Sequence, residues 1–179
     1  MTVEPWQRAE TAGTKKAKVI EKPEAVAAAI KRAKQPLFIV GHKAVETDGS
    51  EKKSIDYVIR IAKTAKIPVV ATAQTVNDFL ERGFEPAAFM SAMDIGNRLT
   101  DPYWNVSGDN KPHDLALILG LPYYMEYVID SGLKTFAPNV KTISLDRFYQ
   151  PHCRMSFPNL SPEEWFKSLD KIVKELEKK

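Results

Sequence analysis

Short apolar runs alternate along the chain with longer segments of helical periodicity. Four runs predict buried strands, because the central strands of a parallel sheet are covered on both faces and read as continuous apolar stretches. They are residues 37–40, within the stretch 35–44, and residues 67–72, 114–119 and 140–145. A glycine or an aspartate follows three of these runs, and Ala73 and Gln74 follow residues 67–72, so loops are expected at the carboxyl ends of these strands.

Between the runs, apolar residues recur every three or four positions, which predicts amphipathic helices. The expected helices cover residues 23–34, 51–65, 75–80, 86–98 and 122–132, with a terminal helix through residue 176. Ser50 is expected to cap the second helix, and a capping box with proline at residues 161–164 opens the last. Residues 99–113 predict a long irregular connection, which in a compact domain is often functional.

The alternation of strands and helices predicts the fold class. We expect an α/β fold, a three-layer α/β/α sandwich with a parallel, Rossmann-like sheet and right-handed crossovers. Residues 1–18 lack usable periodicity and are expected to form an extended N-terminal arm, with Trp6 as its large apolar anchor. Residues 19–179 are expected to form one α/β nucleotide-binding-like domain.

The composition of the chain argues against several kinds of partner and metal site. The 179 residues carry 26 Lys and Arg against 23 Asp and Glu, a dispersed net charge of +3 that argues against nucleic acid binding. Cys153 is the single cysteine, which excludes an intrachain disulfide and a cysteine-ligated cluster or structural zinc. No stretch reads as a membrane span or signal peptide, so a cytoplasmic protein without membrane contact is expected.

The glycine pattern does not match the common phosphate-binding motifs. Gly41 and Gly49 are too far apart for the dinucleotide fingerprint, and Gly49 is followed by Ser and Glu where a P-loop needs Lys and Ser or Thr. There is no Gly-x-Ser-x-Gly nucleophile motif. A conventional pyrophosphate site, a P-loop NTPase and a serine hydrolase are therefore disfavoured.

The candidates for proton transfer or nucleophilic attack are incomplete. His42 and Lys43 follow the first strand without a carboxylate or nucleophile close in sequence, which favours a structural or solvated role. His113 precedes a strand, at the end opposite the expected crevice, and is expected to be structural. His152 and Cys153 are adjacent but lack a third group. No complete catalytic constellation is present.

Two features suggest ligand contacts at the carboxyl side of the sheet. Tyr123, Tyr124 and Tyr127 open the helix after Gly120, where rings could stack on flavin or adenine, although helix residues three and four apart more often belong to the core. Asp146 directly follows a strand and is placed either to accept hydrogen bonds from a ribose or to cap a loop. Both interpretations remain open for each feature.

Several stretches together resemble the epsilon subunit family of the archaeal carbon monoxide dehydrogenase/acetyl-CoA synthase (acetyl-CoA decarbonylase/synthase) complex. They are the arm around residues 5–10, AAAIKRAKQPLFIVGHKA ending at Ala44, KIPVVATAQT ending at Thr75 and HDLALILGLPYY ending at Tyr124. No single motif is diagnostic, but their order and spacing extend over nearly the whole chain.

The same order is similar to the central domain of thiamine-diphosphate enzymes, in which some members hold FAD across the strand ends. This resemblance implies a sheet of about six strands. It also implies a possible FAD groove lined by Gly41, His42, Ala73, Gln74, Gly120 and Asp146. His42 stands where a second glycine is usual, and no Gly-Asp-Gly motif with a trailing Asn occurs, which excludes thiamine diphosphate itself.

The family resemblance implies a partner: the large (alpha) nickel–iron–sulfur carbon monoxide dehydrogenase subunit, in a two-plus-two component of the larger complex. The implied role is stabilisation of that component without chemistry of its own, and electron passage to FAD stays open. Nickel and iron–sulfur clusters are expected only in the partner, since Cys153 alone cannot hold them. Trp6, Tyr103 and Trp104 are candidate contacts if they are exposed.

Two alternatives remain. One is an FAD-binding electron-transfer subunit with its own nucleotide site. The other is an independent NAD-dependent enzyme of the deacylase type, although the zinc-binding cysteines and the glycine-rich opening of that class are missing.

Overall fold

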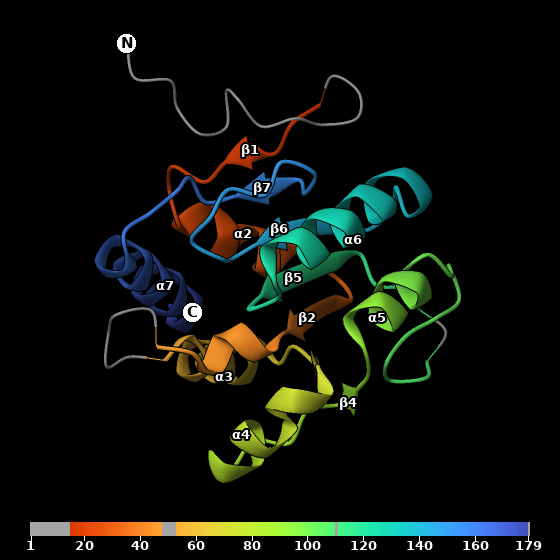
Figure 1. The fold of residues 1–179 in the computed structure, drawn as a ribbon, viewed down its shortest axis with the longest axis horizontal. Helices are drawn as coiled ribbons and strands as arrows, with labels where there is room; N and C mark the ends of the chain where they lie inside the picture. Colours follow the sequence, from red (N-terminus) through yellow and green to blue (C-terminus); the bar gives the residue numbers. More distant parts are fainter. Residues whose placement is uncertain (1–14, 48–52, 110, 179) are drawn as a thin grey trace.

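The computed structural model describes residues 15–47, 53–109 and 111–178. They form a seven-stranded sheet in the order β1-β7-β6-β5-β2-β3-β4, in which every pair of neighbours is parallel (Figure 1). The strands are β1 (Lys18–Val19), β2 (Pro36–Val40), β3 (Val69–Ala71), β4 (Ala88–Phe89), β5 (Leu115–Leu119), β6 (Lys141–Ser144) and β7 (Met155–Ser156).

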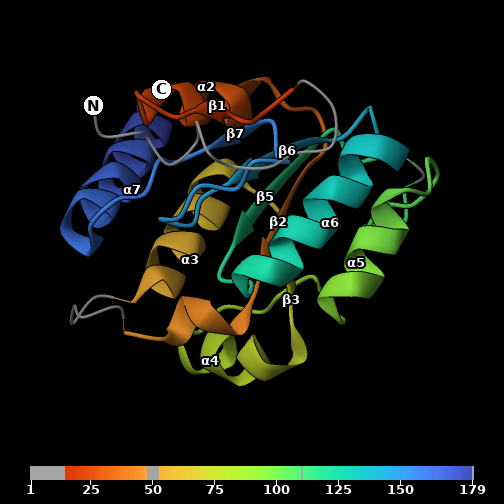
Figure 2. The same cartoon turned by 45° about the horizontal axis from the view of Figure 1, so that its top comes forward.

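Helices cover both faces of the sheet. They are α2 (Glu24–Arg32), α3 (Ser54–Ala65), α4 (Val76–Glu81), α5 (Ala92–Leu99), α6 (Tyr123–Phe136) and α7 (Pro162–Glu177), with short 3₁₀ turns η1 (His42–Val45) and η2 (Ala73–Thr75). Figure 2 shows α2, α3 and α7 on one side of the sheet and α5 and α6 on the other. The predicted three-layer α/β/α sandwich is confirmed, with seven strands rather than about six.

The two-sided burial of the central strands explains their continuous apolar sequence. Phe38 and Val40 of β2 face the core beneath α2, α3 and α7, whereas Leu37 and Ile39 face the core beneath α5 and α6. This alternation follows from the two-residue period of a strand. All four side chains are fully buried.

The sheet changes direction at β2. The chain passes from β2 to its neighbour β3 on one side, and later returns to place β5 on the other side. Connections leave the carboxyl ends of β2 and β5 in opposite directions, which in open α/β sheets is where ligands bind.

The helix predicted over residues 86–98 is wrong in its first half. Ala88 and Phe89 form edge strand β4, in register with Val70 and Ala71 of β3, and α5 begins only at Ala92. The run of alanines and methionines favours a helix locally, but backbone hydrogen bonds to β3 override that preference.

Three other details differ from the sequence-based prediction. The predicted helix end at Gly132 is wrong, because α6 continues to Phe136 and buries Leu133 beyond the glycine. The short strands β1 and β7 were not predicted, and the boundary predicted at residue 18 falls within β1. The helix predicted from residue 51 is described from Ser54, while the predicted cap Ser50 lies outside the described residues.

The predicted capping box at the start of α7 is confirmed. Ser161 Oγ accepts a hydrogen bond from the Glu164 N–H, and the Glu164 carboxylate accepts one from the Ser161 N–H. In the described ranges, no helix combines the length and apolarity needed to cross a bilayer.

Candidate functional site

The candidate site lies at the carboxyl ends of β2, β5 and β6, three strands that stand side by side in the sheet. The loops that leave these strands carry Gly41, Gly120 and Asp146 respectively. Each of these residues follows a buried strand, so the rigid sheet fixes its position.

Gly41 and Gly120 bring two of these loops into direct contact. The Gly41 N–H donates to the Leu119 carbonyl and the Lys43 N–H donates to the Gly120 carbonyl, both at 2.9 Å. A Cβ on Gly41 would overlap the Gly120 carbonyl, and a Cβ on Gly120 would lie 2.6 Å from the Ala44 nitrogen. Gly120 also has φ +80°, which side chains disfavour. Backbone atoms therefore fill the crevice between β2 and β5.

Asp146 ties the third loop to the second. Its Oδ2 accepts a hydrogen bond of 2.9 Å from the Gly120 N–H. The preceding carbonyl, that of Leu145, accepts a 2.7 Å bond from Trp165 Nε1 of α7. Two roles were predicted for Asp146, and the hydrogen bond that it accepts from Gly120 corresponds to the loop-capping role.

The other three residues of the predicted groove lie on its rim. His42 is partly exposed, with Nε2 3.8 Å from Oε1 of Glu46, the residue that follows η1. Ala73 and Gln74 are exposed in η2, which packs against η1. The structure thus joins Gly41, Gly120 and Asp146 in one hydrogen-bonded network. His42, Ala73 and Gln74 lie outside this network.

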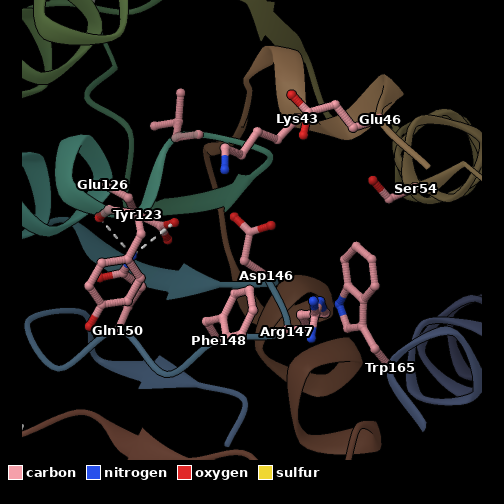
Figure 3. Close-up of a pocket in the computed structure, with 11 residues that line it drawn as sticks. Lys43, Glu46, Ser54, Tyr123, Glu126, Asp146, Arg147, Phe148, Gln150 and Trp165 are labelled. Carbon is pink, nitrogen blue, oxygen red and sulfur yellow. Dashed lines mark hydrogen bonds between the residues drawn. The ribbon is translucent and has the colours of Figure 1, made fainter. Parts of the chain in front are cut away.

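A pocket of about 120 Å³ opens beside this network, on the β6 side (Figure 3). Of the six predicted residues, Asp146 alone lines it. The remaining lining comes from η1 and the residue after it, the start of α3, the loop after β5, α6, the loop after β6, and α7: Lys43, Glu46, Ser54, Leu121, Tyr123, Glu126, Arg147, Phe148, Gln150 and Trp165.

The mouth and floor of this pocket differ chemically. Lys43 and Arg147 supply positive charge, and the Arg147 guanidinium carbon lies 4.1 Å from the centre of the exposed Phe148 ring. Glu126 and Gln150 are buried, with Gln150 Nε2 3.4 Å from Glu126 Oε2. The carboxyl groups of Glu46 and Asp146 also line the pocket, so the anionic part of a ligand would match only the side of Lys43 and Arg147, with an apolar or aromatic part at Phe148.

Two carboxyl groups on the inner side of α6 are fully buried. Burial raises the pKa of Glu126 well above its usual range, and the nearby Asp146 and Asp130 carboxylates raise it further. Burial also raises the pKa of Asp130 to about 7, while the Thr142 hydroxyl opposes that shift. Burial and the neighbouring carboxylates therefore both favour the neutral form of Glu126.

A family model described as CO dehydrogenase beta subunit/acetyl-CoA synthase epsilon subunit matches residues 1–173 of the chain. The chain belongs to this family.

Curated relatives of the epsilon-subunit family align along most of the chain. The acetyl-CoA decarbonylase/synthase complex subunit epsilon of Methanothermobacter thermautotrophicus is 34% identical over 171 residues, covering 96% of this chain and 95% of its own length. Subunit epsilon 1 of Methanosarcina barkeri is 34% identical over 155 residues, covering 86% of each chain. Subunit epsilon 1 of Archaeoglobus fulgidus is 33% identical over 159 residues, covering 87% of this chain and 83% of its own.

Two of the remaining candidates, His113 and Cys153, make hydrogen bonds to the backbone of this epsilon-family chain. His113 is buried; its Nε2 accepts from the Val106 N–H at 3.2 Å, and its Nδ1 lies 3.0 Å from the Gln35 carbonyl oxygen. The Cys153 thiol donates to the Met155 carbonyl, and burial raises the pKa of this thiol well above its usual value. A protonated, buried thiol is a poor nucleophile.

The predicted aromatic candidates divide between the surface and the interior. Tyr123 lines the pocket and donates from its hydroxyl to the Tyr149 carbonyl, while Tyr124 points to solvent. Tyr103 is exposed, whereas Trp104 is partly buried beside His113. The predicted anchor Trp6 lies outside the described residues.

Sequence reasoning missed most residues of the pocket, above all Glu126 and Phe148. Glu126 stands one helical turn after Tyr123, and a lone acid on a helix is usually read as solvent-facing. The available signal was that α6 carries its two acids at positions 126 and 130, four residues apart and in step with the apolar Ile129 and Leu133.

Within the described ranges, no group of three or more His, Cys, Asp or Glu side chains could hold a metal ion. FAD, implied by the fold resemblance, fits this chain only in part. The N–H groups of Gly41, Lys43 and Gly120 are already bonded within the chain, so the predicted groove offers no phosphate cradle between β2 and β5. The pocket beside Asp146 is smaller than the ~300 Å³ or more of a typical ligand site and could take only one end of the molecule.

Proposed function

We propose that this chain is a non-catalytic accessory subunit. In this proposal it binds and stabilises the large nickel–iron–sulfur carbon monoxide dehydrogenase subunit, two copies of each, within a complex that cleaves or synthesises acetyl-CoA. Membership of the epsilon-subunit family supports the assembly, and the relatives are named as subunits of an acetyl-CoA decarbonylase/synthase complex. The observation that carries the proposal is the outward face of α6.

The outward face of α6 is apolar along its length. Tyr124, Val128, Gly132 and Phe136 follow one another at intervals of four residues and form one row. Tyr124 is 69% exposed, Val128 55% and Phe136 71%. Nothing lies within 4 Å of where a Cβ on Gly132 would stand, so the row has a gap at its centre.

No charged side chain of α6 stands fully exposed. Glu126 and Asp130 point inward and are buried, while Lys134 is half-buried and donates from Nζ to the Lys15 carbonyl at 2.6 Å. The outer face of α7 differs, because its exposed residues include Glu163, Glu164, Lys167, Lys171, Lys174 and Glu177.

In α6 the acidic side chains are buried and the exposed row is apolar. An apolar outer face of this kind is characteristic of a helix that is covered on both sides. A helix that is apolar all round is normally buried, and the cores of protein interfaces are depleted of charge. Contiguous exposed apolar surface on a monomer marks an interaction site. We therefore assign the α6 row as the contact with the large subunit, with the gap at Gly132 receiving an apolar side chain of that subunit.

Val128→Glu tests this proposal. A buried, unpaired carboxylate at the centre of an interface should weaken association with the large subunit by at least about thirtyfold, measured by sedimentation or interferometry. Because Val128 is exposed in the isolated chain, the free energy of unfolding of the variant chain should differ from that of the unaltered chain by no more than about 0.5 kcal/mol.

The matched control is Lys171→Glu on the charged face of α7, which should leave association unchanged. Equal affinity of Val128→Glu and the unaltered chain would remove α6 as the contact. Failure of the unaltered chain to bind the large subunit, or turnover by the purified chain alone, would overturn the accessory role.

A second candidate function is electron transfer through bound FAD. The pocket beside Asp146 favours it, since Lys43 and Arg147 could neutralise phosphate groups and Phe148 offers an exposed ring for stacking. Flavin fluorescence should then fall on titration with the chain, and Phe148→Ala should weaken that effect. An unchanged flavin signal, with and without the large subunit, would remove this candidate.

A further inference from the structure

A second pocket, of about 210 Å³, opens at the opposite end of the sheet, beside the start of β6. Its walls come from four separate segments: residues 15–16, the end of α6, the start of β6 and the loop before β7. We infer that this pocket binds a small phosphate-bearing anion through a di- or polyphosphate group. The inference is independent of the proposed contact on α6.

Positive charge is concentrated in this pocket. No aspartate or glutamate is among the lining residues. Five cationic side chains line the pocket: Lys15, Lys16, Lys134, Lys141 and Arg154. The whole chain has an excess of only three positive charges. A concave surface of one sign focuses the field on an oppositely charged ligand.

The adjoining surface adds to this charge. A neighbouring pocket shares Lys141 and Arg154 and adds Arg32, together with one acid, Asp114. Both Asp114 oxygens accept backbone hydrogen bonds, from the N–H groups of residues 34 and 35 at 2.9 and 2.8 Å. The carboxyl end of α6 contributes a partial charge of about −0.5, far less than the five cations supply.

The inner wall of the pocket contains an unsatisfied polar group. His152 is 4% exposed, and its Nδ1 has no hydrogen-bond partner among the described residues. Burial lowers the pKa of His152, and the charge of Lys134 lowers it further, so the ring is neutral and retains one N–H donor. A buried polar atom without a partner is costly, and in the tautomer with the proton on Nδ1 a ligand oxygen that reaches this atom would satisfy it.

Shape favours a small molecule over a protein segment. The volume equals that of about seven water molecules in the liquid, which suits a diphosphate but not a folded segment of another chain. Arginine and lysine together are the usual partners of phosphate, Arg154 as a planar fork and the lysines as point charges.

Calorimetry on the full chain tests this inference, with inorganic pyrophosphate and ADP as probes. Both should bind, and the affinity should fall as salt is raised. The double variant Lys141→Gln/Arg154→Gln should lose about tenfold or more in affinity, because it removes two charge-assisted contacts. Tighter binding of ADP than of pyrophosphate would identify a nucleotide as the source of the phosphate group.

The matched control removes two exposed lysines from α7, Lys171→Gln/Lys174→Gln, and should bind as the unaltered chain does. Three results would overturn the inference: no binding of either probe up to about 1 mM, an equal loss in the control, or tighter binding of an acidic peptide than of pyrophosphate. Thermal unfolding of both variants confirms that they remain folded.

Discussion

The burial of Asp130 predicts that the stability of this protein depends on pH. The residue is fully buried on the inner side of α6. Burial raises its pKa from 3.8 to about 7. The folded state therefore keeps a proton that the unfolded chain releases, and the stability it provides is complete below about pH 4 and lost as pH rises through about 7.

The size of this effect follows from the two pKa values. A shift from 3.8 to about 7 is worth about 4 kcal/mol when fully expressed, and about 3 kcal/mol of it falls between about pH 5 and about pH 8. Asp130→Asn removes the titration. The amide adds a constant cost for its own buried polar atoms, so the difference in stability between the two proteins should change with pH by about 3 kcal/mol.

Urea unfolding of both proteins at several pH values measures this difference. Asp130→Asn should flatten the pH dependence, and since the Asp130 charge also raises the pKa of Glu126, removing it flattens the remaining slope further. Asp170→Asn is the control, because that half-exposed carboxylate lies 3.6 Å from Arg60 on the surface. Parallel pH curves for Asp130→Asn and the unaltered chain would refute the reasoning.

The remaining predictions concern backbone geometry. Gly120→Ala should lower the free energy of unfolding by about 3 kcal/mol or more, because φ is +80° and the new Cβ would lie 2.6 Å from the Ala44 nitrogen. Gly132→Ala should instead raise the free energy of unfolding by about 0.5 to 1 kcal/mol, because this position lies inside α6 and has room for a Cβ. Similar values for the two variants in urea would contradict this. Ser161→Ala should cost about 1 kcal/mol through loss of the N-cap, and an unchanged thermal midpoint would mean that Glu164 caps the helix alone.

The strands that could be predicted from the sequence are those with a continuous apolar run. Residues 37–40 and 115–119 are apolar on both faces, so β2 and β5 were recognisable without knowledge of their partners. The edge strands β1 and β4, and β7 beside β1, are two residues long and show no period. They exist because remote partners supply their hydrogen bonds, which a local pattern does not reveal.

The candidate site was predictable to a similar degree. Gly41, Gly120 and Asp146 could be placed at one edge because each follows a buried strand. That two of these loops touch and fill the crevice depends on the hydrogen bonds from residue 43 to residue 120 and from residue 41 to residue 119, which sequence spacing does not show. Glu126 was missed because its environment, not its residue type, makes it unusual.

The pairing of β1 with β7 brings an early and a late segment of the chain together, and α2 packs beside α7 in the same way. Lys18 lies in register with Met155, so the first strand has no partner until almost the whole chain has been made. During synthesis the central strands can assemble first, while the early segment remains unpaired. We therefore expect this edge of the sheet to be completed last, and to be the step that a ribosome-bound, C-terminally shortened chain cannot carry out.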